Sequence, residues 1–576
     1  MTSRPASAVS LPMSACLWIG VTAHRDPPAG VVPMLEQHVS ALLKRLQAAH
    51  PTLPLAVMSG LAEGGDRLVA RCAIAMGLPV LAVLPMPEEN YARDCRDAAS
   101  AEELKALLRQ SLVITLPMAE GNDADAALIE GLARNRQYAQ LGVFISSHCQ
   151  LLLALWDGKA SEAAGGTSDV VHFHLHGEMP MLERVDQPPN LLADDDSDLV
   201  FHIACPRDRA DGDVATPQAT RWLTANSVSP GDGPMPPHYV QLFEQLGEFN
   251  ADARTYAAEI ERDSHGLLPD EDEVAGVTAL RRIDAIYRQA DWLSLHFKTR
   301  VYQSMALLHV LAVLTGLLVM TYAEFIAHPL LMGATLALFA TGALVAWLGQ
   351  RRSWHRRYLD YRVLAEGLRV QAFWAIAGVP SSRHVRFAYD SFLQKQDVEL
   401  GWIRHAMRGV ALGDEPSPGT AGLRWVVANW VGDGGEIGQA GYFRRRTVER
   451  ERRYRLTERV GHASLALSLA CAVTLLLAGQ LLSPFTGKLL LVLAGVAALF
   501  AGVREAYSHK RADKELIKQY RFMARIFDRA ATLLAGNRGE DEQRRVLESL
   551  GEAALEEHAE WILMHRERPL ETGRLS

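Results

Sequence analysis

Three short segments combine glycines with polar side chains in a pattern that favours binding of an anion. They are Gly20-Val21-Thr22-Ala23-His24-Arg25, Ser59-Gly60-Leu61-Ala62-Glu63-Gly64-Gly65-Asp66-Arg67, and Trp156-Asp157 with Gly165-Gly166-Thr167. Glycines permit tight turns and let backbone N–H groups approach a ligand, while Thr, His and Arg add side-chain donors. A helix that starts at such a turn adds a field that favours phosphate. The segments therefore predict a site for a nucleotide-derived ligand.

The candidate ligand-binding residues of this site are Gly20, Thr22, His24, Arg25, Ser59, Gly60, Glu63, Gly64, Asp66, Arg67, Trp156, Asp157, Gly165, Gly166 and Thr167. No catalytic residue, metal ligand or permanently bound cofactor is predicted. Each feature taken alone also has an ordinary structural explanation. A glycine-rich turn often only reverses the backbone, His24 could be a turn residue, Arg67 an ion-pair partner and Trp156 a core residue. The combination of all three segments favours a binding site.

The elements that must position these residues follow from short apolar runs that alternate with helical patterns over about the first 260 residues. The expected strands are Cys16–Gly20, Pro54–Met58, Val80–Leu84, Leu112–Thr115, Gln150–Leu155 and Val200–Ile203, and the expected crossover helices are Leu35–Ala49 and Asp66–Ala75. This order predicts an α/β Rossmann-like N-terminal domain with a mostly parallel sheet. The three segments follow the first, second and fifth strands. Ligands bind at such carboxyl ends, where the strand order switches.

Four segments of this domain resemble the SLOG superfamily, which comprises Rossmann-like domains related to the LOG phosphoribohydrolases and the DNA-processing protein DprA. The segments are GVTAHRD, SGLAEGGDRLVA, VLAVLPMPEENYARD and LLLALWDGKASEAAGGTSDVV. The resemblance covers about residues 14–205 and assigns a SLOG-like domain to residues 14–210. It implies that the glycine-rich turns bind a nucleotide or an ADP-ribose derivative.

The sequence departs from the enzymatic members of that superfamily. LOG hydrolases carry a PGGxGTxxE segment with a catalytic glutamate, whereas this chain has Gly165-Gly166-Thr167-Ser168-Asp169. Asp169 or Glu63 would have to replace that glutamate as the general base. We therefore expect a binding domain rather than an enzyme. A membrane-tethered hydrolase of nucleotide N-glycosidic bonds is the alternative.

The second half of the chain contains four apolar runs, at about Ser304–Tyr322, Pro329–Leu348, Ala463–Leu482 and Gly487–Val503. A bilayer core of about 30 Å requires about 20 helical residues. Four buried helices of a soluble core would be the alternative, but such helices usually carry a polar stripe, and these runs are apolar all round. The sequence predicts an all-α membrane region with four transmembrane helices in two hairpins and long cytoplasmic helices.

The charge distribution predicts the orientation of these helices. Lys and Arg flank both pairs of runs, but the turns at about Ala323–His328 and Ser483–Phe485 contain neither residue type. The positive-inside rule then places the N-terminal domain, the middle region and the C-terminus in the cytoplasm of a multi-pass inner-membrane protein. Six scattered cysteines without a CxxC pair suit a reducing compartment, and the apolar stretch Cys16–Val21 is too short for a signal sequence. The formal net charge of −8 gives no sign of a nucleic-acid partner.

The membrane half also repeats at an offset of about 158 residues. In each copy, two apolar runs precede a charged helix that ends in Ala-Gly, at Ala377-Gly378 and Ala535-Gly536, and a helix that contains Trp-Ile, at Trp402-Ile403 and Trp561-Ile562. This layout assigns two-transmembrane units to residues 281–412 and 438–570, with a linker and helical connector at residues 211–280.

The segments LGEAALEEHAEWILMHRERPLE and IYRQADWLSLHFKTRVYQ resemble the SLATT family, two-transmembrane effectors associated with SLOG sensors. The resemblance implies a sensor–effector of prokaryotic antiphage defence. A nucleotide second messenger would trigger pore formation or membrane disruption. A pore would require a homo-oligomer, because four spans can hardly enclose a wide channel. The expected partners are a nucleotide-type small molecule and the lipid bilayer. A constitutive channel or scaffold with a vestigial N-terminal domain is a further alternative.

Overall fold

The computed structural model of the protein divides into two compact units. Unit 1 comprises Met1–Gln289, Gly367–Ala375 and Pro380–Ser417, and unit 2 comprises Ala290–Glu366, Ile376–Val379 and Pro418–Ser576. The structure describes residues 11–119, 121–123, 125–160, 165–182, 198–209, 219–268, 278–379, 382–383, 386–387, 400–410, 412, 420–432, 438–536 and 538–566. Parts of the predicted linker, 211–218 and 269–277, and the last residues of the second predicted unit, 567–570, lie outside this range.

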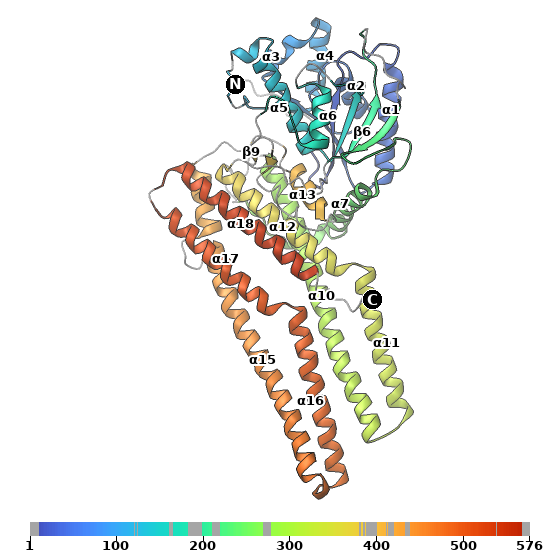
Figure 1. The fold of residues 1–576 in the computed structure, drawn as a ribbon, viewed down its shortest axis with the longest axis vertical. Coiled ribbons are helices and arrows are strands. Elements are labelled where there is room, and N and C mark those ends of the chain that lie inside the picture. Colours follow the sequence, from blue (N-terminus) through green and yellow to red (C-terminus); the bar gives the residue numbers. More distant parts are fainter. Residues whose placement is uncertain are drawn as a thin grey trace. The chain divides into compact units, whose positions relative to one another are not determined.

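An eight-stranded sheet forms the centre of unit 1 (Figure 1), in the order β4-β3-β2-β1-β5-β6-β7-β8. The strands are β1 Leu17–Ala23, β2 Leu55–Ser59, β3 Val80–Leu84, β4 Leu112–Thr115, β5 Leu151–Trp156, β6 Val200–Ala204, β7 Thr220–Thr224 and β8 Ser227–Pro230. The six strands β1 to β6 pair in parallel with one another, and β7 and β8 extend the sheet from β6 in antiparallel pairs. The predicted α/β fold is confirmed, and all six expected strands are present.

Helices follow most of the parallel strands. They are α1 Val32–Ala49, α2 Gly65–Ala75, α3 Glu88–Tyr91, η1 Ala92–Asp94, α4 Ala98–Arg109, η2 Ala126–Leu128, α5 Leu132–His148, α6 Thr167–His176, α7 Pro237–Thr255 and α8 Ala257–Asp263. Both expected crossover helices are present, as α1 and α2. Strands β7 and β8 lie in residues that the sequence assigned to a linker. Trp222 of β7 is buried against the ring of Phe201 of β6, at 4.7 Å between centroids, which holds this extension on the sheet.

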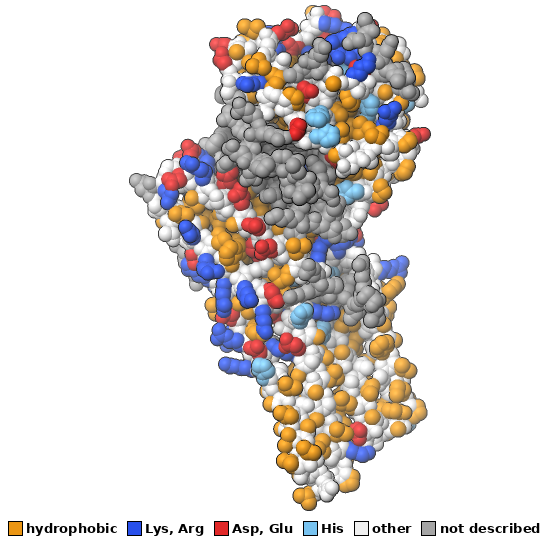
Figure 2. All heavy atoms as spheres, viewed as in Figure 1, with side chains coloured by type: hydrophobic (Ala, Val, Ile, Leu, Met, Phe, Trp, Pro, Cys, Tyr) orange, Lys and Arg blue, Asp and Glu red, His pale blue; other side chains and the backbone are white. Residues whose placement is uncertain are grey.

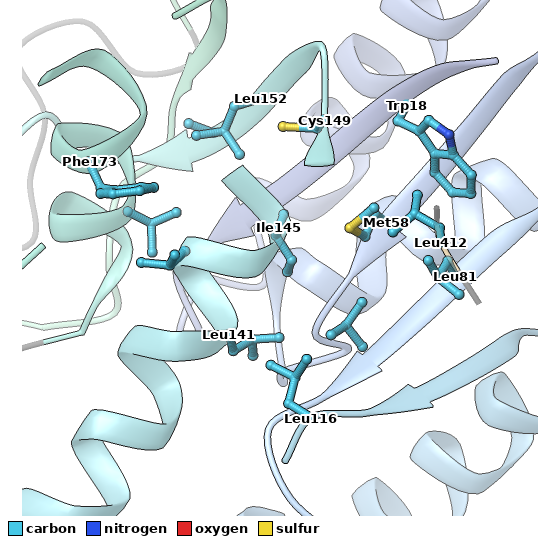
Figure 3. Close-up of a cluster of buried hydrophobic side chains, with 14 of the residues drawn as sticks. Trp18, Met58, Leu81, Leu116, Leu141, Ile145, Cys149, Leu152, Phe173 and Leu412 are labelled. Carbon is cyan, nitrogen blue, oxygen red and sulfur yellow. The ribbon is translucent and has the colours of Figure 1, made fainter. Parts of the chain in front are cut away.

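A distant segment completes the core of unit 1 at the amino end of β1. Helix α13 (Gly401–Val410) passes the buried Trp18 indole, whose Nε1 donates a hydrogen bond to the Gly409 carbonyl at 3.2 Å. Gln150 Nε2 donates to the His405 carbonyl at 3.1 Å. Leu412 lies in the same hydrophobic cluster as Trp18 (Figure 3). The sequence placed residues up to 412 in the first two-transmembrane unit, but α13 packs within unit 1 because it covers apolar surface there.

Two further buried contacts hold α13 in place. The guanidinium of Arg282, 1% exposed, donates hydrogen bonds to the carbonyls of Gly409 and Leu412, both at 3.1 Å. The ring of Trp402 on α13 lies 6.0 Å from that of Phe249 on α7. A short antiparallel pair, β9 Ser382–Arg383 and β10 Arg386–Phe387, also belongs to unit 1. Residues separated by more than 250 positions along the chain therefore form one core.

The second half is helical. The elements are α10 Thr278–Glu324, α11 Pro329–Arg351, α12 Trp354–Ala377, α14 Thr420–Val426, η4 Val427–Val431, α15 Gly438–Ala478, η5 Gly479–Leu481, α16 Pro484–Lys510, α17 Asp513–Leu534 and α18 Glu540–Arg566. In the described residues, four helical stretches are long and apolar enough to cross a membrane: Ala279–Glu324, Pro329–Arg351, Gly438–Leu481 and Pro484–Leu534. All four predicted apolar runs lie in these stretches.

The apolar stretches direct large hydrophobic side chains outward. Leu476 is 82% exposed and Phe339 is 71% exposed. Figure 2 shows hydrophobic side chains covering the lower part of the view, with Lys and Arg gathered above them. Burial of such side chains in protein or lipid is strongly favourable, and a soluble monomer rarely exposes a continuous apolar surface of this kind. The alternative of a soluble helical core does not fit these exposures.

Within unit 2, buried charges join the first part of α12, up to Glu366, to α18. Asp360 is fully buried and accepts a hydrogen bond from Arg566 Nη2 at 3.0 Å. His558 lies between two carboxylates, with Nε2 3.3 Å from Glu366 Oε2 and Nδ1 3.1 Å from Glu557 Oε2. Burial alone lowers the pKa of His558, but the charges of Glu557 and Glu366 outweigh burial and raise it. The imidazolium form therefore stabilises the pairing of α12 with α18.

This pairing is expected to weaken as the pH rises. A histidine with a raised folded pKa gives its full stabilisation below its unfolded pKa of about 6.5 and loses it as the pH passes through the folded value. The melting temperature of the full chain in detergent should fall by a few degrees between neutral and alkaline pH. His558→Gln should remove most of this dependence. An unchanged pH profile in His558→Gln would contradict the assignment.

Candidate functional site

The strand order brings the three glycine-rich segments together. Strand β1 lies between β2 and β5. The chain moves from β1 through β2, β3 and β4 to one edge and then returns to place β5 on the other side of β1. The order therefore switches between β1 and β5, where an α/β sheet opens a crevice outside the carboxyl ends of its strands. All three segments reach this edge, but they do not all follow their strands as predicted: Gly20 and Thr22 lie within β1, because β1 extends to Ala23, while Ser59 ends β2 and Trp156 ends β5.

His24 joins the ends of β1 and β5. Its backbone N–H donates to the Leu155 carbonyl at 3.0 Å, and the Asp157 N–H donates to His24 Nε2, also at 3.0 Å. Asp157 Oδ1 lies 3.2 Å from the same nitrogen, an ion pair only if His24 is protonated. Burial lowers the pKa of His24 despite the opposing charge of Asp157, so the neutral ring that accepts from the amide is the form at neutral pH. His24 thus holds the edge together and is not a free donor.

Other residues of the first segment are also engaged in the fold. A Cβ on Gly20 would lie 2.7 Å from Cys149 Sγ, so this glycine allows β1 to pack against α5. Thr22 is buried, with 8% of its surface exposed. Asp26, which follows the segment, accepts hydrogen bonds from Arg207 Nε at 3.0 Å and Arg209 Nε at 2.7 Å. These contacts tie the turn after β1 to the residues after β6.

The second segment allows the start of α2 to pack closely against the end of β1. Gly64 has a φ of +82°, and a Cβ there would lie 2.4 Å from the Arg25 carbonyl oxygen. The Gly65 N–H donates to the His24 carbonyl at 3.0 Å. Within the turn, Leu61 has a φ of +53° and its N–H donates to Ser59 Oγ at 3.1 Å. The Gly60 carbonyl accepts from the Tyr91 hydroxyl at 2.8 Å.

The close approach at Gly64 gives a sharp test. Gly64→Ala is expected to lower the free energy of unfolding by more than about 2 kcal/mol, because it adds a collision to the strain of a left-handed backbone. Gly158 has almost the same φ, +83°, with nothing within 4 Å of a Cβ, so Gly158→Ala is the matched control and carries the strain alone. Chemical denaturation of the full chain compares the two. Equal losses would show that the approach to Arg25 is unimportant.

Arg67 is fully used inside the domain. The residue is 2% exposed, and its Nε donates to the Leu61 carbonyl at 3.1 Å. Its Nη1 donates to the Ser100 carbonyl at 2.9 Å and lies 3.0 Å from Glu103 Oε2. The sequence predicts Arg67 as a ligand contact. The structure shows a guanidinium that fastens α2 and the turn after β2 to the start of α4.

The carboxylates near this turn are also committed to the protein. Glu63 accepts hydrogen bonds from the Arg96 N–H, at 3.1 Å, and from the Ser100 hydroxyl. Burial raises the pKa of Glu63, but these contacts outweigh it and lower the pKa, which makes the group a weak general base. Burial raises the pKa of Asp66 to about 7 against the hydrogen bonds from the Ala62 and Ala23 backbones and the charge of Arg25.

Arg25 is exposed, whereas the other two predicted cationic residues, His24 and Arg67, are buried. Its guanidinium lies 5.0 Å from the ring centroid of Tyr138 on α5. The Tyr138 hydroxyl donates to Asp94, which also accepts from the buried Arg134 at 2.7 Å. The hydrogen bond to Asp94 therefore fixes the Tyr138 ring, and the Arg25 guanidinium lies over the face of this ring. Tyr138, Asp94, Arg134 and Tyr91 were not predicted from the sequence. The i, i+4 spacing of Arg134 and Tyr138 is a weak signal that places both side chains on one helix face.

The third segment forms the end of β5 and the start of α6. Trp156 Nε1 donates to the Lys159 carbonyl at 2.8 Å. Gly165 has a φ of +83°, and its N–H donates to Asp169 Oδ2 at 2.7 Å. Gly166 is the N-cap residue of α6, and Thr167 is its first residue. Residues 161–164 between these parts lie outside the described residues. Asp169 acts as a cap acceptor in this arrangement.

The arrangement suits binding of an anion better than catalysis. Two helix N-termini, those of α2 and α6, follow the glycine-rich turns after β2 and β5, the two strands that flank β1, and Arg25 supplies an exposed positive charge. Both carboxylates considered as general bases, Glu63 and Asp169, already accept hydrogen bonds from the backbone. Among the described residues, no group of three or more His, Cys, Asp or Glu side chains is placed to hold a metal ion.

No protein-family model matches this chain, and comparisons with curated proteins and with solved structures find no similar protein. The site at the β1/β5 switch point and the four apolar helices are therefore the features from which a function can be inferred.

Proposed function

We propose that this protein is a membrane-anchored sensor–effector whose N-terminal α/β domain binds a nucleotide-derived second messenger. The observation that carries the proposal is the position of Arg25. Its exposed guanidinium lies over Tyr138, and the carbonyl of the same residue is the atom that a Cβ on Gly64 would meet at the N-terminus of α2. A fixed cation, a helix N-terminus and a switch in strand order coincide, and an anionic ligand fits this combination.

The ligand's phosphate is proposed to lie between Arg25 and the first turn of α2. The Leu68 N–H donates to the Gly64 carbonyl at 3.1 Å and closes the first α-helical turn. The amides of Asp66 and Arg67 precede this bond, so helix geometry leaves them without an intrahelical acceptor. Charge-assisted hydrogen bonds from Arg25 and these amides would hold the phosphate. A nucleotide or an ADP-ribose derivative is the ligand class that the resemblance to SLOG domains adds.

The apolar helices are proposed to cross the inner membrane as two hairpins. Helices α15 and α16 pack along one another and are joined by the short segment Gly479–Ser483, and α10 and α11 are joined by Phe325–His328. Lys and Arg flank the apolar runs at the opposite ends. The positive-inside rule therefore favours a cytoplasmic N-terminal domain, middle region and C-terminus. With the resemblance to SLATT effectors, this supports a homo-oligomeric pore or membrane disruption in prokaryotic defence.

Ligand binding can drive this effector only if the ligand has different affinities for two states of the protein. Binding at the β1/β5 edge would order the turns after β1, β2 and β5 together. The state of the α/β domain that carries these ordered turns would be the one that favours assembly of the membrane helices. A hydrolase of nucleotide N-glycosidic bonds is the second candidate, but the engaged positions of Glu63 and Asp169 disfavour it.

Calorimetric titration of the full chain in lipid nanodiscs tests this proposal. The probes are ADP-ribose, its cyclic forms and a panel of cyclic mono- and dinucleotides, and the recovered probe is analysed by chromatography. The proposal predicts that one probe binds and is recovered intact. Recovery of a cleaved probe would establish the hydrolase instead. Absence of binding across the panel would overturn the assignment of the site to this ligand class.

A further inference from the structure

Unit 2 contains a cavity of about 310 Å³ among α10, α15 and α16. The cavity exists because several of its lining residues have small side chains, among them Ser468 of α15 and Gly495 and Ala498 of α16. A Cβ on Gly495 would lie 2.5 Å from Cε of Met320, which shows how closely α10 approaches α16 beside the cavity. The volume is at the lower end of the range for small-molecule sites, about 300–1,000 Å³.

One residue that lines this cavity carries a carboxylate, and an ammonium group contacts the backbone of the same residue. Glu324 lines the cavity and is the last residue of α10. Lys488 Nζ donates a hydrogen bond to the backbone carbonyl of Glu324, which leaves the Glu324 carboxylate outside that contact. Within the described residues, no hydrogen bond or ion pair reaches this carboxylate. Figure 2 shows an acidic and a basic side chain side by side within the hydrophobic surface.

This combination is unusual for an apolar region. A carboxylate beside apolar surface is costly unless a cation or hydrogen-bond donor accompanies it. Lys488 is exposed at the same place and can accompany a phosphate. A ligand that matches the site therefore has an apolar chain, an ammonium group and a phosphate group.

We propose that this cavity binds one phospholipid that carries a primary ammonium group, such as phosphatidylethanolamine. An acyl chain occupies the cavity, the ammonium donates hydrogen bonds to Glu324, and the phosphate lies against Lys488. The site rests on the proposed membrane insertion of the helices, and the orientation proposed above puts it in the non-cytoplasmic leaflet. The phosphate of an anionic phospholipid without an amine could pair with Lys488, but this lipid would place a further negative charge beside the Glu324 carboxylate.

The test measures which lipids remain bound to the full chain. The protein is reconstituted into phosphatidylcholine vesicles with equal amounts of phosphatidylethanolamine and phosphatidylglycerol, extracted in mild detergent, and its co-purified lipids are quantified. We expect about tenfold enrichment of phosphatidylethanolamine over phosphatidylglycerol, the effect of one charge-assisted hydrogen bond. Glu324→Gln should remove that preference, and Ala498→Leu should fill the cavity and remove the bound lipid. Ala340→Leu is the matched control, because Ala340 is an exposed residue of α11.

Four outcomes decide the matter. Enrichment that both site variants abolish and Ala340→Leu preserves supports the lipid site. Equal enrichment in Ala498→Leu, or a preference for phosphatidylglycerol, overturns it. A lipid-free protein that cross-links as a dimer through α16 shows that a second copy fills the cavity, and also overturns it. Extraction of the wild-type chain from vesicles by alkaline carbonate would instead refute membrane insertion, and with it both proposals.

Discussion

Replacement of Gly409 by valine is expected to lower the free energy of unfolding of unit 1 by about 2–3 kcal/mol. A Cβ at this position would lie 2.8 Å from Cδ1 and 2.9 Å from Nε1 of Trp18. The Trp18 side chain is fully buried, so the indole has no open space into which to move. Movement of α13 instead would break the hydrogen bond from Trp18 Nε1 to the Gly409 carbonyl. Both responses are costly.

Hydrogen–deuterium exchange of the β1 peptide in the full chain measures this effect, together with chemical denaturation. Gly30→Val is the control, because a Cβ at Gly30 has nothing within 4 Å. Faster exchange of β1 in Gly409→Val alone would support the packing of α13 on this strand. Unchanged exchange would contradict it. The same contacts imply that a fragment that ends near residue 260 exposes Trp18, so binding experiments require the full chain.

Replacement of Arg25 by alanine is expected to weaken binding of the proposed nucleotide ligand by about 10- to 100-fold, the usual effect of losing charged hydrogen bonds worth about 1.5–3 kcal/mol. Arg25 is exposed, and its described side-chain contact is the face of Tyr138. The fold and membrane insertion should therefore persist. The affinity is measured by calorimetry on the full chain in nanodiscs, with the probe that binds the wild type.

Arg109→Ala is the matched control for Arg25→Ala. Arg109 is an exposed arginine at the end of α4, before β4, and is therefore at the amino edge of the sheet. Its ion pair with Glu102 is on the surface and contributes little to stability. If Arg25→Ala and the wild type bind the ligand with equal affinity, Arg25 does not contact the ligand. Equal loss in Arg109→Ala would show that the net charge of the domain, and not a specific contact, governs binding.

Much of the fold was predictable because its signals are local. Six strands and two crossover helices were assigned from short apolar runs and helical periodicity, and four apolar runs identified the membrane-capable helices. The convergence of the three glycine-rich segments followed from the rule that parallel strands end at one edge of a sheet. These inferences require only the pattern of a segment and its place in the chain order.

The remaining features depend on contacts that no local pattern encodes. Trp18 and Gly409 are 391 residues apart, and nothing in the α13 sequence indicates that it packs on β1. The neighbours of Arg67 in the sequence predict a ligand contact, but they do not reveal the partners that the structure shows, the Leu61 carbonyl and the α4 residues Ser100 and Glu103. The sequence does not predict a role for Tyr138, because no glycine-rich turn or other binding motif lies next to it in α5. Side-chain roles depend on tertiary partners, which composition and spacing leave open.

Dye release tests most directly whether a ligand bound to the α/β domain makes the membrane permeable. The full chain is reconstituted into dye-filled liposomes, and the fraction with its α/β domain outside is determined by protease accessibility. The nucleotide identified by calorimetry is then added. We predict release that depends on ligand concentration in the wild type and is lost in Arg25→Ala, with both proteins inserted equally. Ligand binding without release, or equal release in the absence of ligand, would contradict the account.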